Sequence, residues 1–408
     1  MEPSASKGGV RPLDGITVVS LEHAIAAPFC TRQLADLGAR VIKVERAGEG
    51  DFARYYDTRV AGLSSHFVWV NRSKESLALD LKSAAASDVM ERLLARADVF
   101  VQNLAPGAAA RLGLSAGQLH ARNRRLVVCD ISGYGNAGPY RDRTAYDLLI
   151  QAEAGFLSVT GTHSEPAKAG ASIADIAAGM YAYSSILAAL LLRDRTGEGS
   201  HIDVSMLESL AEWMGYPLYY AYGGADPPPR LGAAHATIYP YGPFVAGDGR
   251  TVMLGLQNER EWQKFCEVVL EDRALSSDPR FESNAQRNAH REALHALILE
   301  RFGRLTSAQV RERLDRAQIA NADMNTMHDV WRHPQLAARG RWSEVASPAG
   351  PLPALRPPGA NDRFDSRMDP IPRVGEHNEP ILHELGFDDA FIERIGNPPA
   401  ARTARAQP

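Results

Sequence analysis

Short apolar runs alternate with longer stretches of helical periodicity along the first half of the chain. The apolar runs are rich in β-branched residues and predict strands at residues 16–21, 40–45, 77–81, 98–102 and 125–131. The stretches between them hold good helix formers and predict helices at residues 27–37, 84–97 and 108–112. This alternation is typical of parallel strands joined by right-handed crossovers, so we predict an α/β fold with a doubly wound, Rossmann-like parallel sheet.

A longer apolar stretch, residues 173–192, is long enough to span a bilayer if it is a helix. It carries a carboxylate, Asp175, near its start, and it has tyrosines and serines in its middle. No second stretch of this kind occurs in the sequence. We therefore predict no membrane span but the central buried helix of a large soluble domain, followed by a strand at 201–206 and a helix at 207–222.

The composition changes at residues 223–232, where glycines and consecutive prolines cannot continue a helix or a central strand. We place a domain boundary there. The expected parts are a large domain at 11–223, a smaller α+β domain at 224–330, a C-terminal arm returning to the large domain at 331–396, and disordered tails at 1–10 and 397–408. In the smaller domain we predict a hairpin strand at 249–256 and amphipathic helices at 261–270, 287–302 and 307–316.

The charge balance restricts the class of partner. The 408 residues include 45 basic and 49 acidic side chains, a net charge of −4, which gives no overall attraction for nucleic acid. A small anionic ligand in a local basic pocket fits better. The three cysteines, Cys30, Cys129 and Cys266, lack the spacing of a metal site or a disulfide framework. The first residues contain no apolar core of a signal peptide, so a cytoplasmic protein is expected.

The turn after the first predicted strand, from Glu22 to Phe29, contains no glycine. Nucleotide-binding folds of the dehydrogenase and P-loop types need glycines there, because only a backbone without Cβ lets phosphate approach the helix. The histidines are scattered without metal-ligand spacing. We therefore predict neither a nucleotide-dependent nor a metal-dependent enzyme of those classes, and no permanently bound cofactor.

Asp175 is the one charged residue of the apolar stretch, and it follows a run of small residues. One interpretation is structural: Ser172 and Asp175 have the spacing of a capping box, in which the carboxylate satisfies the N-cap backbone N–H. The other is catalytic: a carboxylate nucleophile at a helix N-terminus, where neighbouring backbone N–H groups also stabilise an oxyanion. Composition and spacing leave both interpretations open.

Four cations accompany the predicted strands, namely Arg46, Arg72, Lys74 and Arg111. Ligands bind at the carboxyl edge of an open α/β sheet, so these side chains form a candidate phosphate clamp. The alternative is that they are ordinary surface cations. Residue types alone do not decide between the two.

Several short motifs occur together and in a fixed order. They are Pro12-Leu-Asp-Gly-Ile16, the stretch 38–46 with Gly50-Asp51, Asn71-Arg-Ser-Lys74, 103–107 with Arg111-Leu-Gly113, Ser132-Gly-Tyr-Gly135, 197–206, Gly375-Glu-His-Asn378 and Leu385-Gly386. In this order they resemble the class III CoA-transferases, the family of formyl-CoA and crotonobetainyl-CoA transferases. The resemblance covers nearly the whole chain.

The resemblance implies a reaction and a set of site residues. Asp175 matches the family's catalytic aspartate, which takes CoA from an acyl-CoA through a mixed anhydride, holds it as an aspartyl-CoA thioester and passes it to a free carboxylic acid. The CoA thioester is then a substrate, and the protein is an interlocked homodimer. By the same resemblance the CoA-binding residues are Ile25, Arg46, Lys74, Asn103, Arg111, Leu112 and Tyr146, of which Tyr146 flanks the thioester.

Departures from the family's pattern narrow the substrate. Ile25 stands where formyl-CoA transferases have glutamine, and the run of glycines that guards their site is missing, which argues against formate. Tyr146 precedes Asp147 where the related α-methylacyl-CoA racemases have histidine, which removes one of two acid/base groups. Residues 145–155 and 211–216 look most like transferases of short C4 and C5 dicarboxylates, so succinyl-CoA with itaconate or mesaconate is expected. A racemase and a non-catalytic acyl-CoA-binding protein are the alternatives.

Overall fold

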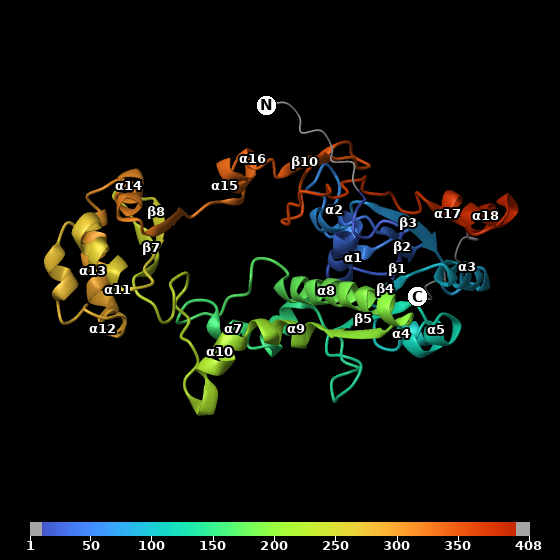
Figure 1. Ribbon diagram of the computed structural model, residues 1–408, viewed down its shortest axis with the longest axis horizontal. Coiled ribbons are helices and arrows are strands. Elements are labelled where there is room, and N and C mark those ends of the chain that lie inside the picture. The colour runs from blue at the N-terminus through green and yellow to red at the C-terminus, as the bar shows by residue number, and fades with distance from the viewer. Residues whose placement is uncertain (1–9, 397–408) are drawn as a thin grey trace, which may run out of the picture. The chain divides into compact units, whose positions relative to one another are not determined.

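The computed structural model describes residues 10–396, and the chain divides into two compact units (Figure 1). Within the described residues, unit 1 comprises 10–154, 170–214 and 336–396. Unit 2 comprises 155–169 and 215–335.

This division differs in detail from the one expected from the sequence. The small domain was expected as one continuous segment, 224–330, whereas unit 2 takes in an earlier excursion of the chain and begins directly after Met214. The predicted tails lie outside the described residues except for Val10.

Unit 1 is built around a six-stranded parallel sheet in the order β3-β2-β1-β4-β5-β6. The bounds are β1 Thr17–Leu21, β2 Arg40–Arg46, β3 Lys74–Leu79, β4 Val99–Gln102, β5 Val127–Ser132 and β6 His201–Ser205. Each strand corresponds to an apolar run of the sequence, and the doubly wound parallel sheet is confirmed. Because the order reverses between β1 and β4, the crevice where such sheets bind ligands lies at the carboxyl ends of these two strands.

Helices cover both faces of the sheet, which parallel strands require because their residues are apolar on both sides. On one face, strand residues such as Leu21, Ile42 and Phe100 share a buried core with α3, α5 and α17. On the other, α1 and α8 pack against each other (Figure 1). The helices of unit 1 are α1 Ala26–Asp36, α2 Ser65–Val70, α3 Ala84–Ala95, α4 Ala108–Arg111, α5 Ala116–Arg122, α6 Asp147–Glu153, α8 Ile173–Thr196, α9 Met206–Trp213, α17 Asn378–Glu384 and α18 Asp389–Gly396, with a 3₁₀ turn η1 at Phe52–Tyr55.

The C-terminal part of unit 1 covers the free edge of the sheet. β3 is the edge strand, and its Ala78 N–H donates to Asn378 Oδ1 at 2.7 Å. The His377 N–H donates to Ser76 O at 3.0 Å. Residues at the start of α17 therefore satisfy backbone groups that an exposed edge leaves open to other strands. The same part of the chain holds a hairpin of β10 Trp342–Val345 and β11 Leu352–Leu355.

α8 is the apolar helix expected from the sequence, and it begins at Ile173. By length and composition alone it is the one helix in residues 10–396 that is apolar enough to cross a membrane, with a mean hydropathy of 1.5 over its best window. It packs against α1, α9, β5 and β6 within unit 1. About 39% of that window is buried there, so part of the helix faces outward.

A glycine permits the close approach of α1 and α8. A Cβ on Gly179 would lie 2.7 Å from the Ala26 carbonyl oxygen and 3.0 Å from Phe29 Cδ1. Ala26 is the first residue of α1, so the turn between β1 and α1 lies against the first part of α8. The carbonyl is backbone and cannot turn away, so a methyl group here must push the two helices apart.

We expect Gly179→Ala to lower the free energy of unfolding by about 1–3 kcal/mol, because it overpacks a helix contact that cannot relax. The matched control is Gly117→Ala, a helical position with open space around it, where alanine is neutral or stabilising. Urea denaturation of both variants measures the difference. Equal stabilities of the two variants would contradict the close contact.

Unit 2 is smaller and has its own core. Its antiparallel sheet has the order β7-β8-β9, and the core gathers large aromatic side chains such as Trp262, Phe265 and Phe302. Its strands are β7 Tyr241–Val245, β8 Thr251–Gly255 and β9 Ala320–Asp323, and its helices are α7 Phe156–Val159, α10 Gly215–Tyr220, α11 Glu259–Lys264, α12 Asn284–Ala289, α13 Arg291–Phe302, α14 Ser307–Ala317 and α15 Met327–Trp331. α16 Pro334–Ala338 lies at the passage back to unit 1, and short turns occur at η2 Tyr222–Gly224, η3 Phe265–Val269 and η4 Arg273–Ser277.

The helix predicted at 287–302 is two helices in the structure. His290 leaves the helical conformation, with φ −109° and ψ 29°, and separates α12 from α13. The hairpin strand predicted at 249–256 corresponds to β8, which pairs with β7.

Candidate active site

Asp175 lies in the first turn of α8, and a second carboxylate caps this helix. Asp147 Oδ1 accepts the backbone N–H of Ala174 at 2.8 Å and that of Asp175 at 3.2 Å. The N-cap residue Ser172 makes no capping hydrogen bond with its side chain. The capping-box interpretation is therefore wrong, and the Asp175 carboxylate has no hydrogen-bond partner in the part of the chain that the structure describes.

Asp147 is itself held in place. Its other carboxylate oxygen, Oδ2, accepts from the Gln151 amide at 2.6 Å. Gln151 is fully buried one turn later in α6. This role could not be predicted from the sequence, because Asp147 lies in α6 and precedes the helix that it caps by more than a turn or loop. Oδ1 of Asp147 therefore holds the first turn of α8 while Oδ2 is held within α6, which gives this carboxylate a positioning role.

The surroundings of Asp175 favour its neutral form. Burial raises the pKa of Asp175 to about 7, and the negative charge of Asp147 adds to this shift. The carboxylate is poorly solvated when it does ionise, and near neutral pH a substantial fraction is ionised. Perturbed groups of this kind concentrate at catalytic sites. The site can therefore present a reactive carboxylate nucleophile.

Two tyrosines lie near Asp175. Burial raises the pKa of Tyr56 to about 12, and the charges of Asp51 and then Asp175 add to the shift. Tyr146 also contributes to the raised pKa of Tyr56. It is the N-cap residue of α6 and is 68% exposed. Tyr56 therefore keeps its proton at neutral pH and lies within electrostatic reach of the Asp175 carboxylate. The sequence motifs pointed to Tyr146 but not to Tyr56.

The first backbone N–H groups of α8 are already engaged. Ile173 N–H donates to Ala171 O at 2.8 Å, and Ile176 N–H donates to Ser172 O at 2.9 Å. The two N–H groups between them donate to the capping carboxylate described above. The expectation that these groups stabilise an oxyanion is not met, because each already has an acceptor.

The turn between β1 and α1, residues 22–25, is fixed at the crevice of the sheet. The Asn103 side chain, after β4, accepts from His23 N–H at 2.8 Å and donates to His23 O at 2.9 Å. Asp51 Oδ1 accepts from Ala24 N–H at 3.3 Å. Asn103 therefore positions this turn across the gap between β1 and β4. Ile25 is only 2% exposed and supplies apolar packing at the start of α1 in place of a polar contact.

Lys74 is buried and fully paired, which corrects its place in the predicted phosphate clamp. Its Nζ donates to Glu22 Oε1 at 2.6 Å and to Pro28 O at 3.0 Å. The third donor reaches Asn71 Oδ1 at 3.2 Å, so the ammonium has no donor left for a phosphate. Burial lowers the pKa of Lys74 to about 8, although the Glu22 carboxylate opposes the shift.

Arg72 is also already paired with a carboxylate, so it is not available to the predicted phosphate clamp. Its guanidinium forms two hydrogen bonds with the Asp36 carboxylate, at 2.9 Å from Nε and 2.8 Å from Nη2. Both side chains are buried. The motif that contains Arg72 and Lys74 precedes β3, so it lies at the amino end of that strand and not at the carboxyl edge where ligands bind.

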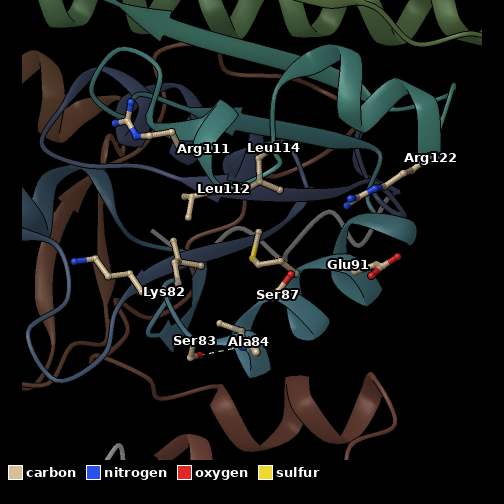
Figure 2. Close-up of a pocket in the computed structure, with 12 residues that line it drawn as sticks. Lys82, Ser83, Ala84, Ser87, Glu91, Arg111, Leu112, Leu114 and Arg122 are labelled. Atoms are coloured by element: carbon tan, nitrogen blue, oxygen red, sulfur yellow. Dashed lines mark hydrogen bonds between the residues drawn. The ribbon is translucent and has the colours of Figure 1, made fainter. Parts of the chain in front are cut away.

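Arg111 and Leu112, at the end of α4, line a cavity of about 560 Å³ (Figure 2). Lys82, from the turn before α3, lies toward the same end of this cavity as Arg111, while Arg122 lies at the opposite end (Figure 2). Lys82 was not predicted from the sequence, although it lies only three residues after Leu79, the last residue of β3. Two cations on one side of a cavity are suited to a phosphate group.

Arg46 lines a second cavity, of about 350 Å³, together with His23, Phe52 and Tyr55. Its guanidinium is exposed and forms an ion pair with Glu49 at 2.9 Å. Of the four cations in the predicted clamp, Arg46 and Arg111 are therefore the two whose side chains are exposed. Between residues 10 and 396 there is no group of three or more histidine, cysteine and acidic side chains that could hold a metal ion.

We expect Arg111→Ala and Lys82→Ala each to raise the KM for acyl-CoA by about tenfold or more, because a charge-assisted hydrogen bond to phosphate is lost. The KM for the free acid stays unchanged, since the acid has no phosphate. Arg124→Ala, an exposed cation paired at 3.6 Å with Glu198, is the control and leaves both constants unchanged. Steady-state kinetics with both substrates varied decide this, and equal effects on the two KM values would contradict a phosphate site.

Known proteins resemble this chain along nearly its whole length. The sequence model of CoA-transferase family III matches residues 13–378. An acyl-CoA transferase of Fusarium pseudograminearum is 35% identical over 406 residues, which are 96% of this chain and 88% of that protein. The succinyl-CoA:glutarate CoA-transferase of Homo sapiens is 31% identical over 400 residues, 96% of this chain and 90% of that protein.

A third relative and a solved structure extend the comparison. The succinyl-CoA:mesaconate CoA-transferase of Haloarcula marismortui is 29% identical over 399 residues, 92% of this chain and 97% of that protein. The crystal structure of a CAIB/BAIF family protein from Brucella suis matches with a TM-score of 0.82 at 34% identity, covering 92% of this chain and 99% of that one. The chain is therefore an enzyme that belongs to CoA-transferase family III.

Proposed function

We propose that this enzyme moves CoA between succinyl-CoA and a short C4 or C5 dicarboxylate such as itaconate or mesaconate, with Asp175 as the nucleophile. One observation carries the proposal: the Asp175 carboxylate stands unpaired at the head of α8, because Asp147 caps the helix in its place. The choice of dicarboxylates is supported by the relatives named as succinyl-CoA:glutarate and succinyl-CoA:mesaconate CoA-transferases.

The first half of the reaction removes the acyl group from CoA. An Asp175 oxygen attacks the thioester carbonyl carbon, the carbon–sulfur bond breaks, and CoA leaves as a thiolate with a mixed anhydride on the enzyme. The thiolate then attacks the aspartyl carbonyl carbon of the anhydride. The donor acid leaves as a carboxylate, and an aspartyl-CoA thioester remains.

The second half runs the same steps in reverse. The acceptor carboxylate attacks the aspartyl thioester and releases the thiolate, which attacks the acceptor's carbonyl in the new anhydride and frees the Asp175 carboxylate. Each tetrahedral intermediate carries an oxyanion that needs a hydrogen-bond donor. Since the N–H groups of the first turn of α8 have acceptors already, we assign this role to the Tyr56 and Tyr146 hydroxyls.

A racemase on the same fold is less well supported. Proton exchange at an α-carbon needs two acid/base groups, and in the related racemases one of them is a histidine just before the aspartate that matches Asp147. Here that residue is Tyr146, which has a phenol in place of the imidazole.

The proposal includes the interlocked homodimer that the sequence resemblance implies. Large apolar side chains are exposed on two helices of unit 1: Leu148 and Leu149 on α6 are 47% and 50% exposed, and Leu191 and Leu192 on α8 are 62% and 53% exposed. A second copy of the chain that covers them would remove this apolar surface from water. Light scattering should then give about twice the chain mass of 44.4 kDa.

Incubation with a panel of acyl-CoAs and free acids, followed by mass spectrometry of the CoA esters, tests the proposed reaction. We expect new itaconyl-CoA or mesaconyl-CoA, and free succinate, when succinyl-CoA is the donor. New CoA esters of monocarboxylates alone, or none at all, would contradict the proposed substrates.

A further inference from the structure

Four rings form a row, hereafter the aromatic row, that leads away from the turn at residues 22–25. His23 stacks on Phe52 with ring centres 5.4 Å apart, and Phe52 lies 5.8 Å from Tyr56. The next ring is His66, whose centre lies 5.3 Å from the centre of the Tyr56 ring, with the two ring planes at 89°. The row begins in the turn that leads into Ala26, whose carbonyl oxygen packs against Gly179 of α8, and its third member is Tyr56, whose pKa the charge of Asp175 helps to raise. His66 therefore stands at the outer end of the candidate active site.

His66 is held on one side and open on the other. Its Nδ1 lies 3.3 Å from Asp57 Oδ2, and its side chain is 44% exposed. Asp57 is fixed in turn, because it accepts from Ser65 N–H at 3.0 Å, from Ser65 Oγ at 2.7 Å and from Arg59 N–H at 2.9 Å. No described residue hydrogen-bonds to His66 Nε2. A substrate carboxylate on the open side of the ring can accept a hydrogen bond from Nε2.

The buried cations of this region are committed to protein carboxylates. Lys43 Nζ donates to Asp51 at 2.7 Å, and Lys43 is buried. Arg54 pairs with Glu45 at 2.6 Å. Lys74 and Arg72 are engaged as described above. Of the two histidines of the aromatic row, His23 is the less suited to carry charge, because burial lowers its pKa. His66 is therefore the side chain of the row that can offer positive charge to a substrate without breaking a buried ion pair.

We propose that His66 binds the second carboxylate of the dicarboxylic substrates and so determines their selection over monocarboxylates. With both ring nitrogens protonated, the imidazolium donates Nδ1–H to Asp57 and Nε2–H to the substrate. Because donor and acceptor acids occupy the same place in turn, one subsite serves succinyl-CoA in the first half-reaction and the acceptor in the second. The inference rests on the proposed function.

The test compares a dicarboxylic with a monocarboxylic substrate pair: succinyl-CoA with glutarate, and butyryl-CoA with pentanoate. We expect His66→Phe to lower kcat/KM for the dicarboxylic pair about tenfold or more, which is the loss of one charge-assisted hydrogen bond, and to leave the monocarboxylic pair within twofold. His66→Arg restores most of the loss, because arginine supplies charge and donors. His383→Phe is the matched control and changes neither pair, because His383 on α17 is also 44% exposed and lies 3.3 Å from an aspartate, Asp389, but lines no part of the site.

Three outcomes would contradict these claims. The first two concern the role of His66, and the third concerns the proposed function. An equal loss for both substrate pairs, or no loss for either, would overturn the role of His66. A failure of His66→Arg to recover the dicarboxylic pair while His66→Gln recovers it would replace the charge by a neutral hydrogen bond and overturn the inference as stated. If the unmodified enzyme transfers CoA between neither pair, the proposed function itself falls.

Discussion

Asp175→Asn should abolish CoA transfer and leave the protein folded. The asparagine keeps the size of the side chain but has no nucleophilic oxygen, and loss of a covalent nucleophile typically costs about 10⁴-fold or more in kcat. The fold should survive because Asp147, and not Asp175, caps α8. Asp194→Asn, an exposed carboxylate in the last turn of the same helix, should keep full activity. Turnover by Asp175→Asn within tenfold of the parent would contradict the nucleophilic role.

The same substitution should stabilise the protein at alkaline pH. The pKa of Asp175 is about 7 in the folded state and near its ordinary value in the unfolded chain, so its contribution to stability is complete only at low pH. It is lost progressively as the pH rises through 7, because a poorly solvated charge then forms in the folded state. We expect Asp175→Asn to exceed the parent by about 1–2 kcal/mol in free energy of unfolding at pH 8, with a smaller difference at pH 5. Urea denaturation at the two pH values measures this.

Asp147→Ala should have the second-largest effect on activity. It removes the acceptor of two backbone N–H groups at the head of α8 and breaks the hydrogen bond that the Gln151 amide donates to Asp147. A nucleophile displaced by a fraction of an ångström to an ångström loses about a hundredfold in rate, so we expect kcat to fall by about 10- to 100-fold. The lost cap should lower the free energy of unfolding by only about 1 kcal/mol.

The pH profile separates the two contributions of Asp147. The parent's kcat should rise with pH through about 7, as Asp175 ionises. In Asp147→Asn the side-chain oxygen still accepts the two N–H groups but the charge is gone, so the rise should move to lower pH while burial keeps it above the range of an ordinary aspartate. An unchanged profile in Asp147→Asn would show that the two carboxylates do not interact. Asp142→Asn, an exposed carboxylate, is the control.

The sequence was sufficient for most of the sheet, because β1, β2, β4 and β5 are rich in buried apolar residues. β1, β2 and β4 lie within a residue or two of the predicted ranges, and the apolar helix begins at Ile173 as expected. The predicted boundary was wrong where a strand includes polar residues. β3 begins at Lys74 and not at residue 77, because the Lys74 ammonium has buried acceptors on segments that are distant in the sequence.

The same cause explains the errors at the site. Lys74 and Arg72 have the residue type and spacing of phosphate ligands, and only the fold reveals that Glu22 and Asp36 neutralise them. The capping box at Ser172 failed because a carboxylate from α6 competes for the same N–H groups. Motifs identify which residues matter, whereas pairing between distant segments decides what each of them is free to do.

The covalent intermediate tests the central claim most directly. The enzyme is mixed with succinyl-CoA in the absence of an acceptor acid, treated with hydroxylamine, and digested for mass spectrometry. Transfer through Asp175 predicts a hydroxamate on the peptide that contains the start of α8, and its absence in Asp175→Asn under the same conditions. A parent enzyme that transfers CoA at its full rate, with intersecting steady-state lines and no hydroxamate at Asp175, would contradict the account.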